Sequence, residues 1–192
     1  MKPHIKPKPL NKQIKLHKHK YIMSRTDTRG FIQYANDYFT EISGYTTEEL
    51  IGANHNIIRH PDMPAVIFKL MWERLKNGQQ IHAVVKNLSK SGEYYWVTTK
   101  FDIKRHPFDN KIVGYLAYRQ AASPKTIKII SEFYDKLLSI EEINGIEASE
   151  KYLRGYLEER GVTYDTFIDD IIDNNSIMKI FFKAMSTFFS KH

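Results

Sequence analysis

The run from Asn54 to Pro64 holds the densest set of side chains that could do chemistry. It reads Asn-His-Asn-Ile-Ile-Arg-His-Pro-Asp-Met-Pro, so two histidines, an arginine, an aspartate and two asparagines share one loop. An arginine beside the free backbone N–H groups of a helix start makes a site for an anion. The alternative is a capped loop with polar groups on the surface. A metal site on His55 and His60 would lack a third ligand, so we expect none.

Other chemistry is limited by what the chain lacks. It has no cysteine, which excludes disulfides, thiolate zinc sites, iron–sulfur clusters, a cysteine nucleophile and a cysteine–flavin adduct. No phosphate-cradling glycine loop, GxSxG or HExxH pattern is present. The sequence therefore shows no catalytic set, and we expect a protein that is not an enzyme.

The elements around the loop would position its polar groups. Pro61 suits a first helical position, so a helix is expected from there to the stop at Gly78. The strand from Gln80 to Leu88 has two faces, because side chains alternate along a strand. We expect the face that holds Val85 and Asn87, together with residues 81 and 83, to form a cavity wall. The other face carries His82 and Lys86 and is expected to point outward.

The order of elements along the chain indicates the fold class. Two strands (21–25 and 31–35) precede a block of short and medium helices, and three strands at 80–88, 94–103 and 112–120 follow. Successive strands with short turns pair antiparallel. The sequence therefore predicts an α+β fold with a five-stranded antiparallel sheet and helices on one side.

The positive charge of the chain lies in its first twenty residues. The net charge is +7, and residues 1–20 hold seven lysines and no acidic residue, so the remainder is neutral. We expect a disordered or extended basic tail over 1–20. A neutral body offers no basic groove, so no nucleic-acid partner is expected. No stretch is apolar enough for a secretory signal or a spanning helix, so we expect a cytoplasmic protein.

The residues after the sheet have helical spacing to the end of the chain. Ser123-Pro124 predicts a helix start, and further helices are expected at 147–160, 164–172 and 177–190. The last carries a stripe of four phenylalanines and two methionines. The stripe must be buried either against the helix of Phe133 and Leu137 or in an interface with a partner or a second copy of the chain. We expect this 123–192 extension to receive the signal from the sheet.

Residues 21–122 resemble the PAS domain of the bacterial aerotaxis-receptor family, and more particularly soluble members that lack a membrane anchor. The resemblance covers about half of the chain. It rests on the stretches Tyr34-Ala35-Asn36-Asp37, Ser43-Gly44-Tyr45-Thr46, His55-Asn56-Ile57-Ile58-Arg59-His60-Pro61-Asp62-Met63-Pro64, Met71-Trp72, Val85-Lys86-Asn87 and Tyr95-Trp96-Val97.

The resemblance implies a function, a cofactor and a site. Members of the family hold FAD non-covalently, sense redox state or oxygen, and pass the signal to a chemotaxis signalling domain. This chain has no such output region, so the resemblance implies a separate chemotaxis transducer or other signalling protein as partner. Carried over by motif position, the cofactor contacts are Asn36, His55, Arg59, His60, Asp62, Trp72 and Asn87.

One departure from the family pattern keeps alternatives open. The family typically has tryptophan, a small residue and glycine before the Val-Lys-Asn strand, where this chain has Ile81-His82-Ala83. A stacking partner for the cofactor is therefore missing. The alternatives are a cofactor-free PAS module for protein–protein interaction and a haem gas sensor. A haem would need His55 or His60, because His82 is expected on the outer face.

Overall fold

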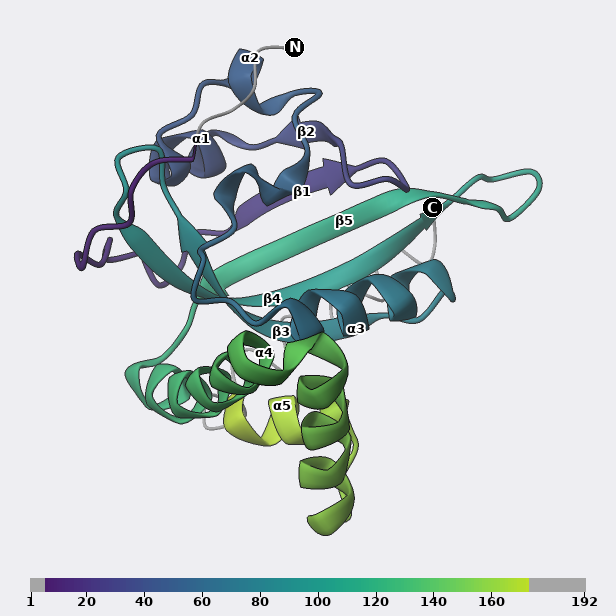
Figure 1. Ribbon diagram of the computed structural model, residues 1–192. Helices are drawn as coiled ribbons and strands as arrows, with labels where there is room; N and C mark the ends of the chain where they lie inside the picture. The colour runs from purple at the N-terminus through teal and green to yellow at the C-terminus, as the bar shows by residue number, and fades with distance from the viewer. Residues whose placement is uncertain (1–5, 173–192) are drawn as a thin grey trace.

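Five antiparallel strands form one sheet in the order β2-β1-β5-β4-β3, and the computed structural model describes residues 6–172 of the chain (Figure 1). The strands are β1 (Ile22–Thr26), β2 (Ile32–Ala35), β3 (Ile81–Leu88), β4 (Tyr94–Arg105) and β5 (Ile112–Ala121). A turn or loop joins β1 to β2, β3 to β4 and β4 to β5, and the helical block joins β2 to β3. The predicted α+β fold with an antiparallel sheet is confirmed.

Short helices on one side of the sheet form between β2 and β3. They are α1 (Asp37–Ser43), α2 (Thr47–Leu50), the 3-10 helix η1 (His55–Ile58) and α3 (Ala65–Lys76). Each of the first three begins at a side-chain cap: Asn36 accepts from Phe39, Thr46 forms a capping box with Glu49, and Asn54 accepts from Asn56. These caps are local, so the sequence alone fixes where the helices begin.

Helix α3 begins later than the sequence predicts. Its first residue is Ala65, and Pro64 stands at the N-cap without a side-chain hydrogen bond. The expected start at Pro61 is wrong because Pro64 disfavours a helical conformation at the residue before it. Residues 60–63 form a turn instead, in which the backbone N–H of Asp62 donates to His60 Nδ1 at 3.1 Å.

The outer strands of the sheet have hydrogen-bond partners on their free edges. On β2, the Ile32 N–H donates to the Ala53 carbonyl at 2.9 Å, and the Gly52 N–H donates to the Ile32 carbonyl at 2.8 Å. On β3, the Tyr134 hydroxyl donates to the Val84 carbonyl at 2.8 Å. The backbone groups of Ile32 and Val84, which would otherwise face solvent at these edges, are therefore engaged.

The C-terminal helices pack on the opposite face of the sheet, below β3 and β4 in Figure 1. Helix α4 runs from Pro124 to Glu159, with Ser123 as its N-cap, and α5 runs from Tyr164 to Ile172. Gly145 interrupts α4 with φ 81° and ψ 172°, a conformation that is essentially restricted to glycine. The interruption divides α4 close to the boundary between the two helices predicted from the sequence.

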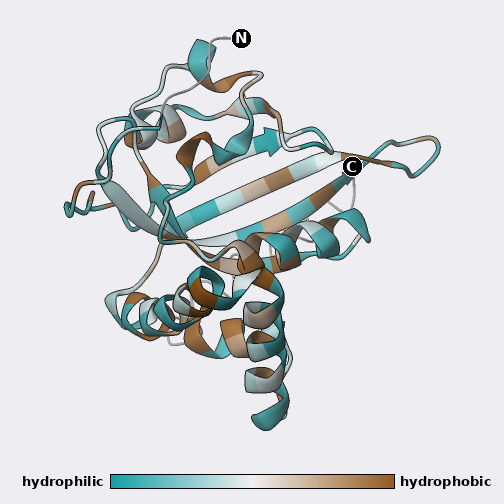
Figure 2. Ribbon diagram, in the orientation of Figure 1, coloured by the Kyte–Doolittle hydropathy of each residue, from teal (hydrophilic) through white to brown (hydrophobic). Residues whose placement is uncertain are grey.

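An aromatic cluster joins α4 to α5 and to the sheet. The Phe133 ring centroid lies 4.6 Å from that of Tyr156 and 5.2 Å from that of Phe167, and Tyr134 stacks on Trp96 of β4 at 6.4 Å. Figure 2 shows α5 as a largely hydrophobic helix beside α4, and Ile168 and Ile171 of α5 belong to the same buried core as Phe133 of α4. This face of α4 is therefore already covered by described residues. The predicted helix 177–190 and its apolar stripe lie outside the described residues.

Residues 6–20 lie extended against the turn between β3 and β4. The Leu10 N–H donates to the Gly92 carbonyl at 2.7 Å, the Ile14 N–H to the Tyr94 carbonyl at 2.8 Å, and the Tyr94 N–H to the Lys12 carbonyl at 3.0 Å. Ile14 is also half-buried against the core. Of the two predicted states, disordered or extended, residues 6–20 take the extended one, and their order comes from backbone bonds and spaced apolar residues rather than from composition.

No helix within residues 6–172 has both the length and the apolar character needed to cross a membrane.

Candidate functional site

A cavity of about 330 Å³ lies between the sheet and the helices η1 and α3. Strands β3, β4 and β5 contribute one wall, and α3 contributes the other through Phe68, Met71, Trp72 and Leu75. Four cationic side chains line it: Arg29, Arg59, Lys69 and Arg119. No aspartate or glutamate within the described part of the chain is among the lining residues. The cavity is therefore suited to a ligand that carries negative charge.

Four of the seven predicted contact residues line this cavity. They are His55, Arg59, Trp72 and Asn87. Strand parity placed Asn87 correctly, since Val85 and Asn87 face the cavity while His82 bonds to Asp169 of α5 at 2.9 Å on the other face. The expected cavity wall is wrong for Ile81 and Ala83 of the same face, which are buried in the core and are not part of the cavity lining; Ile81 stands at the position of the missing tryptophan.

The other three predicted residues lie outside the cavity. Asn36 caps α1 and also bonds to the backbone of Tyr21 and Met23, so its amide is used within the fold. Asp62 is half-exposed and pairs with Lys86 at 2.5 Å. His60 is buried beside that pair. The motif is continuous in sequence, but the turn before Pro64 directs His60 and Asp62 toward β3 rather than toward the cavity.

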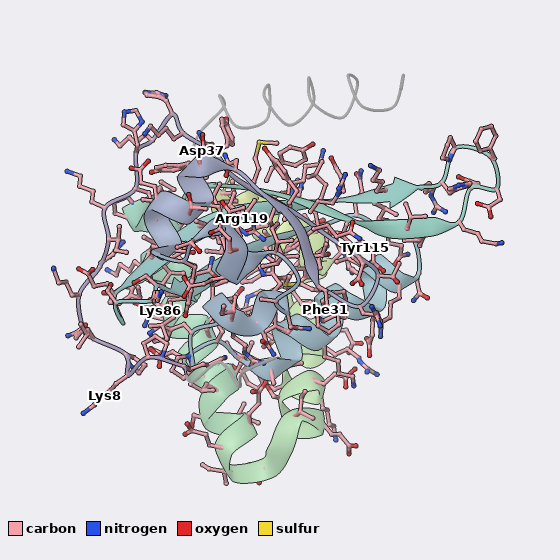
Figure 3. All side chains as sticks on the ribbon, turned by 90° about the horizontal axis from the view of Figure 1, so that it is seen from above. Lys8, Phe31, Asp37, Lys86, Tyr115 and Arg119 are labelled. Atoms are coloured by element: carbon pink, nitrogen blue, oxygen red, sulfur yellow. The ribbon has the colours of Figure 1, made fainter. Side chains whose placement is uncertain are left out.

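Arg119 of β5 is the cavity residue that the sequence reasoning missed. Its guanidinium donates to Ser24 Oγ at 3.0 Å and to His55 Nε2 at 2.8 Å, and it lies 5.7 Å from the Phe39 ring centroid. No carboxylate among residues 6–172 forms an ion pair with it. Burial lowers the pKa of Arg119 to about 10, which still leaves the group charged at neutral pH. Figure 3 shows Arg119 deep within the molecule, in contrast to Lys8 at the periphery.

The contact with Arg119 determines the protonation of His55. A guanidinium can only donate, so Nε2 of His55 must accept and the imidazole proton resides on Nδ1. Burial, and next the charge of Arg119, lower the pKa of His55 well below its ordinary value. His55 is therefore a neutral acceptor whose Nε2 is already engaged.

An unpaired amide and aromatic rings complete the cavity wall. Asn87 lines the cavity, and its Nδ2 has no hydrogen-bond partner of normal geometry among the described residues; Tyr95, its neighbour in the sheet, is fully buried and is not part of the lining. The rings of Trp72 and Tyr115 meet edge-on with centroids 5.7 Å apart. The Trp72 ring also packs on Gly30, where a Cβ atom would come within 2.9 Å of it. A buried polar group without a partner points to a ligand that would satisfy it.

Two histidines with lowered pKa values predict a loss of stability in mild acid. Burial and the Lys86 charge lower the pKa of His60 to about 4, against the opposing effect of Asp62, and the pKa of His55 is also lowered. Both groups have pKa values near 6.5 in the unfolded chain. Below that pH the unfolded state therefore binds protons that the folded state does not, and stability falls as the pH drops toward 4.

The expected slope is up to about 1.4 kcal/mol per pH unit for each histidine. Urea unfolding at pH 7 and pH 5 measures it. A His60→Asn variant should flatten the dependence, whereas His19→Asn, at an exposed residue of the N-terminal segment that forms no ion pair with a described acid, should not. A slope that is equal in all three proteins would contradict this account of His60.

Comparison with known proteins supports the architecture and places the chain among relatives. A family model described as the PAS fold matches residues 32–118. The aerotaxis receptor of Escherichia coli is 36% identical over 140 residues, which cover 73% of this chain and 26% of the receptor. The nitrogen fixation regulatory protein of Klebsiella pneumoniae is 28% identical over 101 residues, covering 53% of this chain and 20% of that protein. The chain thus spans about a quarter or less of the length of these relatives.

Solved structures share the fold at low identity. The light-state structure of the blue-light photoreceptor Aureochrome1 LOV domain has a TM-score of 0.52 at 20% identity, covering 58% of this chain and 89% of that one. A light-oxygen-voltage domain studied with a flavin analogue has a TM-score of 0.51 at 21% identity, covering 60% and 86%. These likenesses concern the arrangement of the sheet and its helices.

Proposed function

Since the chain carries a PAS signal-sensing domain of the aerotaxis-receptor family, we propose that it senses redox state or oxygen with a non-covalently bound FAD. The observation that carries this proposal is Arg119, a buried cation that faces the cavity and has no carboxylate partner among the described residues. A buried charge of this kind is costly unless something compensates it. A flavin ring, whose carbonyl oxygens accept hydrogen bonds and whose negative charge grows on reduction, would do so.

The residues present fit such a group. The cavity volume lies at the lower end of the range for small-molecule sites, so it suits a ring system with the rest of a dinucleotide at the mouth. Trp72, Phe101 and Tyr115 supply aromatic surface in place of the missing tryptophan. Arg59, which lies over the Phe68 ring at 4.5 Å, would hold phosphate near the mouth. The chain has no cysteine, so an adduct through a thiol is excluded.

Bound flavin would supply a reversible change of redox state, and the side chains around it would respond to that change. Arg119 would stabilise added negative charge on the ring, and the Asn87 amide would donate a hydrogen bond to its edge. His55 would hold Arg119 in place by accepting from it. A change in these bonds biases the surrounding elements, which is the physical basis of a two-state signal.

A haem sensor is disfavoured by the positions of the histidines. His55 Nε2 accepts from Arg119, His60 lies outside the cavity, and His82 bonds to Asp169 on the other face. We also propose that the protein has no turnover chemistry, that it is cytoplasmic, and that its output passes to a separate chemotaxis transducer or other signalling protein. Self-association as a homodimer is a further proposal, and the molar mass in solution tests it.

The absorption spectrum of the purified full chain, before and after incubation with FAD, tests the cofactor. We expect flavin bands and one FAD per chain. An Asn87→Leu variant should bind FAD with a midpoint potential lower by roughly 30 mV, because it loses a hydrogen bond worth about 1.4 kcal/mol that favours the reduced ring. His82→Ala, on the opposite face of the same strand, is the control and should match the parent. A protein that stays colourless with FAD would favour the cofactor-free interaction module instead.

A further inference from the structure

A carboxylate from the C-terminal helices caps the helix that forms one wall of the cavity. Both oxygens of Glu141 in α4 accept hydrogen bonds from the first turn of α3, from the Ala65 N–H at 2.7 Å and the Val66 N–H at 2.8 Å. The N-cap residue Pro64 provides no side-chain bond. The start of α3 therefore depends on a residue that is 76 positions away along the chain.

The same surface of α4 carries the acids that face two of the cavity cations. Burial lowers the pKa of Arg59, and the nearby Glu141 carboxylate opposes this effect. Lys69 of α3 pairs with Glu150 of α4 at 2.5 Å. Arg59 and Lys69 both line the cavity, and no acid lines it within the described part of the chain. The two cations therefore stand between the cavity on one side and the acids of α4 on the other.

The break in α4 lies between these two acids. Gly145 has a φ of 81°, and a Cβ atom added to it would have nothing within 4 Å. The neighbouring Ile143 is 76% exposed. The two halves of α4 are therefore joined at a point that is not packed against the rest of the described chain, although the second half is held by Tyr156, which packs on Phe133, and by Ser149, whose hydroxyl donates to the Leu137 carbonyl at 3.1 Å.

We propose that Glu141 and Glu150 compete with an anionic ligand for Arg59 and Lys69, so that filling the cavity loosens the contact between α4 and α3. The inference rests on the proposed function for the identity of the ligand, since the phosphates of FAD would supply the anion. Because coupling between two binding events is reciprocal, the contact of Glu141 and Glu150 with the two cations lowers the affinity for the ligand, and bound ligand weakens that contact. Once released from α3, helix α4 would expose a surface to which a signalling partner binds.

The affinity of the full chain for FAD tests the competition. A Glu141→Gln/Glu150→Gln double variant keeps a side-chain oxygen for the α3 cap but loses both charges. It should bind FAD more tightly by roughly 5-fold or more, the lower end of usual coupling between sites. Riboflavin, which has no phosphate, should bind the variant and the parent equally. Glu142→Gln is the matched control, because Glu142 is exposed on the same helix and has no hydrogen bond or ion pair with α3 among the described residues. Unchanged or weaker FAD binding by the double variant would overturn the proposal.

Hydrogen exchange of the parent protein gives a second readout that needs no variant. Amides of residues 147–159 should exchange faster when FAD is bound, and riboflavin should have a smaller effect. If the parent binds no flavin, the proposed cofactor is wrong, and inorganic pyrophosphate becomes the probe of the cavity cations. Faster exchange with pyrophosphate would then support the competition on its own. Equal exchange with and without every bound anion would contradict it.

Discussion

Replacing Arg119 with methionine is expected to stabilise the ligand-free protein and to weaken FAD binding. The guanidinium is 3% exposed and has no carboxylate partner within residues 6–172, so its desolvation is compensated only by Ser24, His55 and the Phe39 ring. An apolar side chain of similar length removes that cost, and we expect a gain of about 1–3 kcal/mol in the free energy of unfolding. Ser24 Oγ and His55 Nε2, 3.1 Å apart, can satisfy each other in the variant.

The same change removes the charge that a bound flavin would meet. A hydrogen bond to a charged group contributes about 1.5–3 kcal/mol, so the affinity for FAD should fall by roughly 10- to 150-fold. Urea unfolding without ligand and FAD titration measure the two effects. Lys104→Met, at an exposed cation of β4, should change neither quantity. A variant that is less stable and binds FAD normally would show that Arg119 serves the fold rather than the ligand.

Deleting residues 1–16 should lower the free energy of unfolding by about 2–4 kcal/mol. Three backbone hydrogen bonds to Gly92 and Tyr94 would be lost, each worth about 0.5–1.5 kcal/mol. The half-buried surfaces of Ile14 and Leu16 would be lost as well, and the core beneath them would meet water. Part of this is offset by the chain entropy that the deleted segment no longer gives up on folding.

A charge-neutral version of the segment separates its packing from its lysines. Changing Lys8, Lys15 and Lys18 to glutamine keeps every backbone bond and removes three exposed charges. This variant should stay within about 0.5 kcal/mol of the parent, since exposed charges contribute little. Urea midpoints of the two variants at the same pH make the comparison. If the deletion variant unfolds at the same urea midpoint as the parent, the segment contributes nothing to the stability of the fold.

Features set by local periodicity could be predicted from the sequence. The alternation of β3 placed Val85 and Asn87 in the cavity, because the two-residue period of a strand leaves no other choice once one face is buried. The cap at Asn36 and the capping box at Thr46 were likewise readable from neighbouring residues. The same parity argument on β5 places Arg119 on the face of Tyr115 and Ala117. A single arginine on an apolar face was therefore a signal available in the sequence.

Features that depend on distant contacts could not be predicted in this way. The motif from His55 to Asp62 suggested one site, but a turn before Pro64 separates His60 and Asp62 from the cavity. The order of residues 6–20 depends on a hairpin some 80 residues later. The cap of α3 comes from Glu141 in another part of the chain. The last two are fixed by tertiary packing, which composition and periodicity do not encode, whereas the turn before Pro64 has a local cause that the expected helix start at Pro61 overlooked.

The occupied sheet edges restrict how another protein can attach to this domain. Many recognition domains bind an extended peptide by adding it as an extra strand, which requires a row of free N–H and C=O groups on an outer strand. Here Ile32 of β2 is bonded to residues 52 and 53, and Val84 of β3 accepts from Tyr134. Strand addition would have to break these bonds first. A partner is therefore expected to recognise side chains on the helices, and its binding should be sensitive to surface substitutions rather than to backbone-directed peptides.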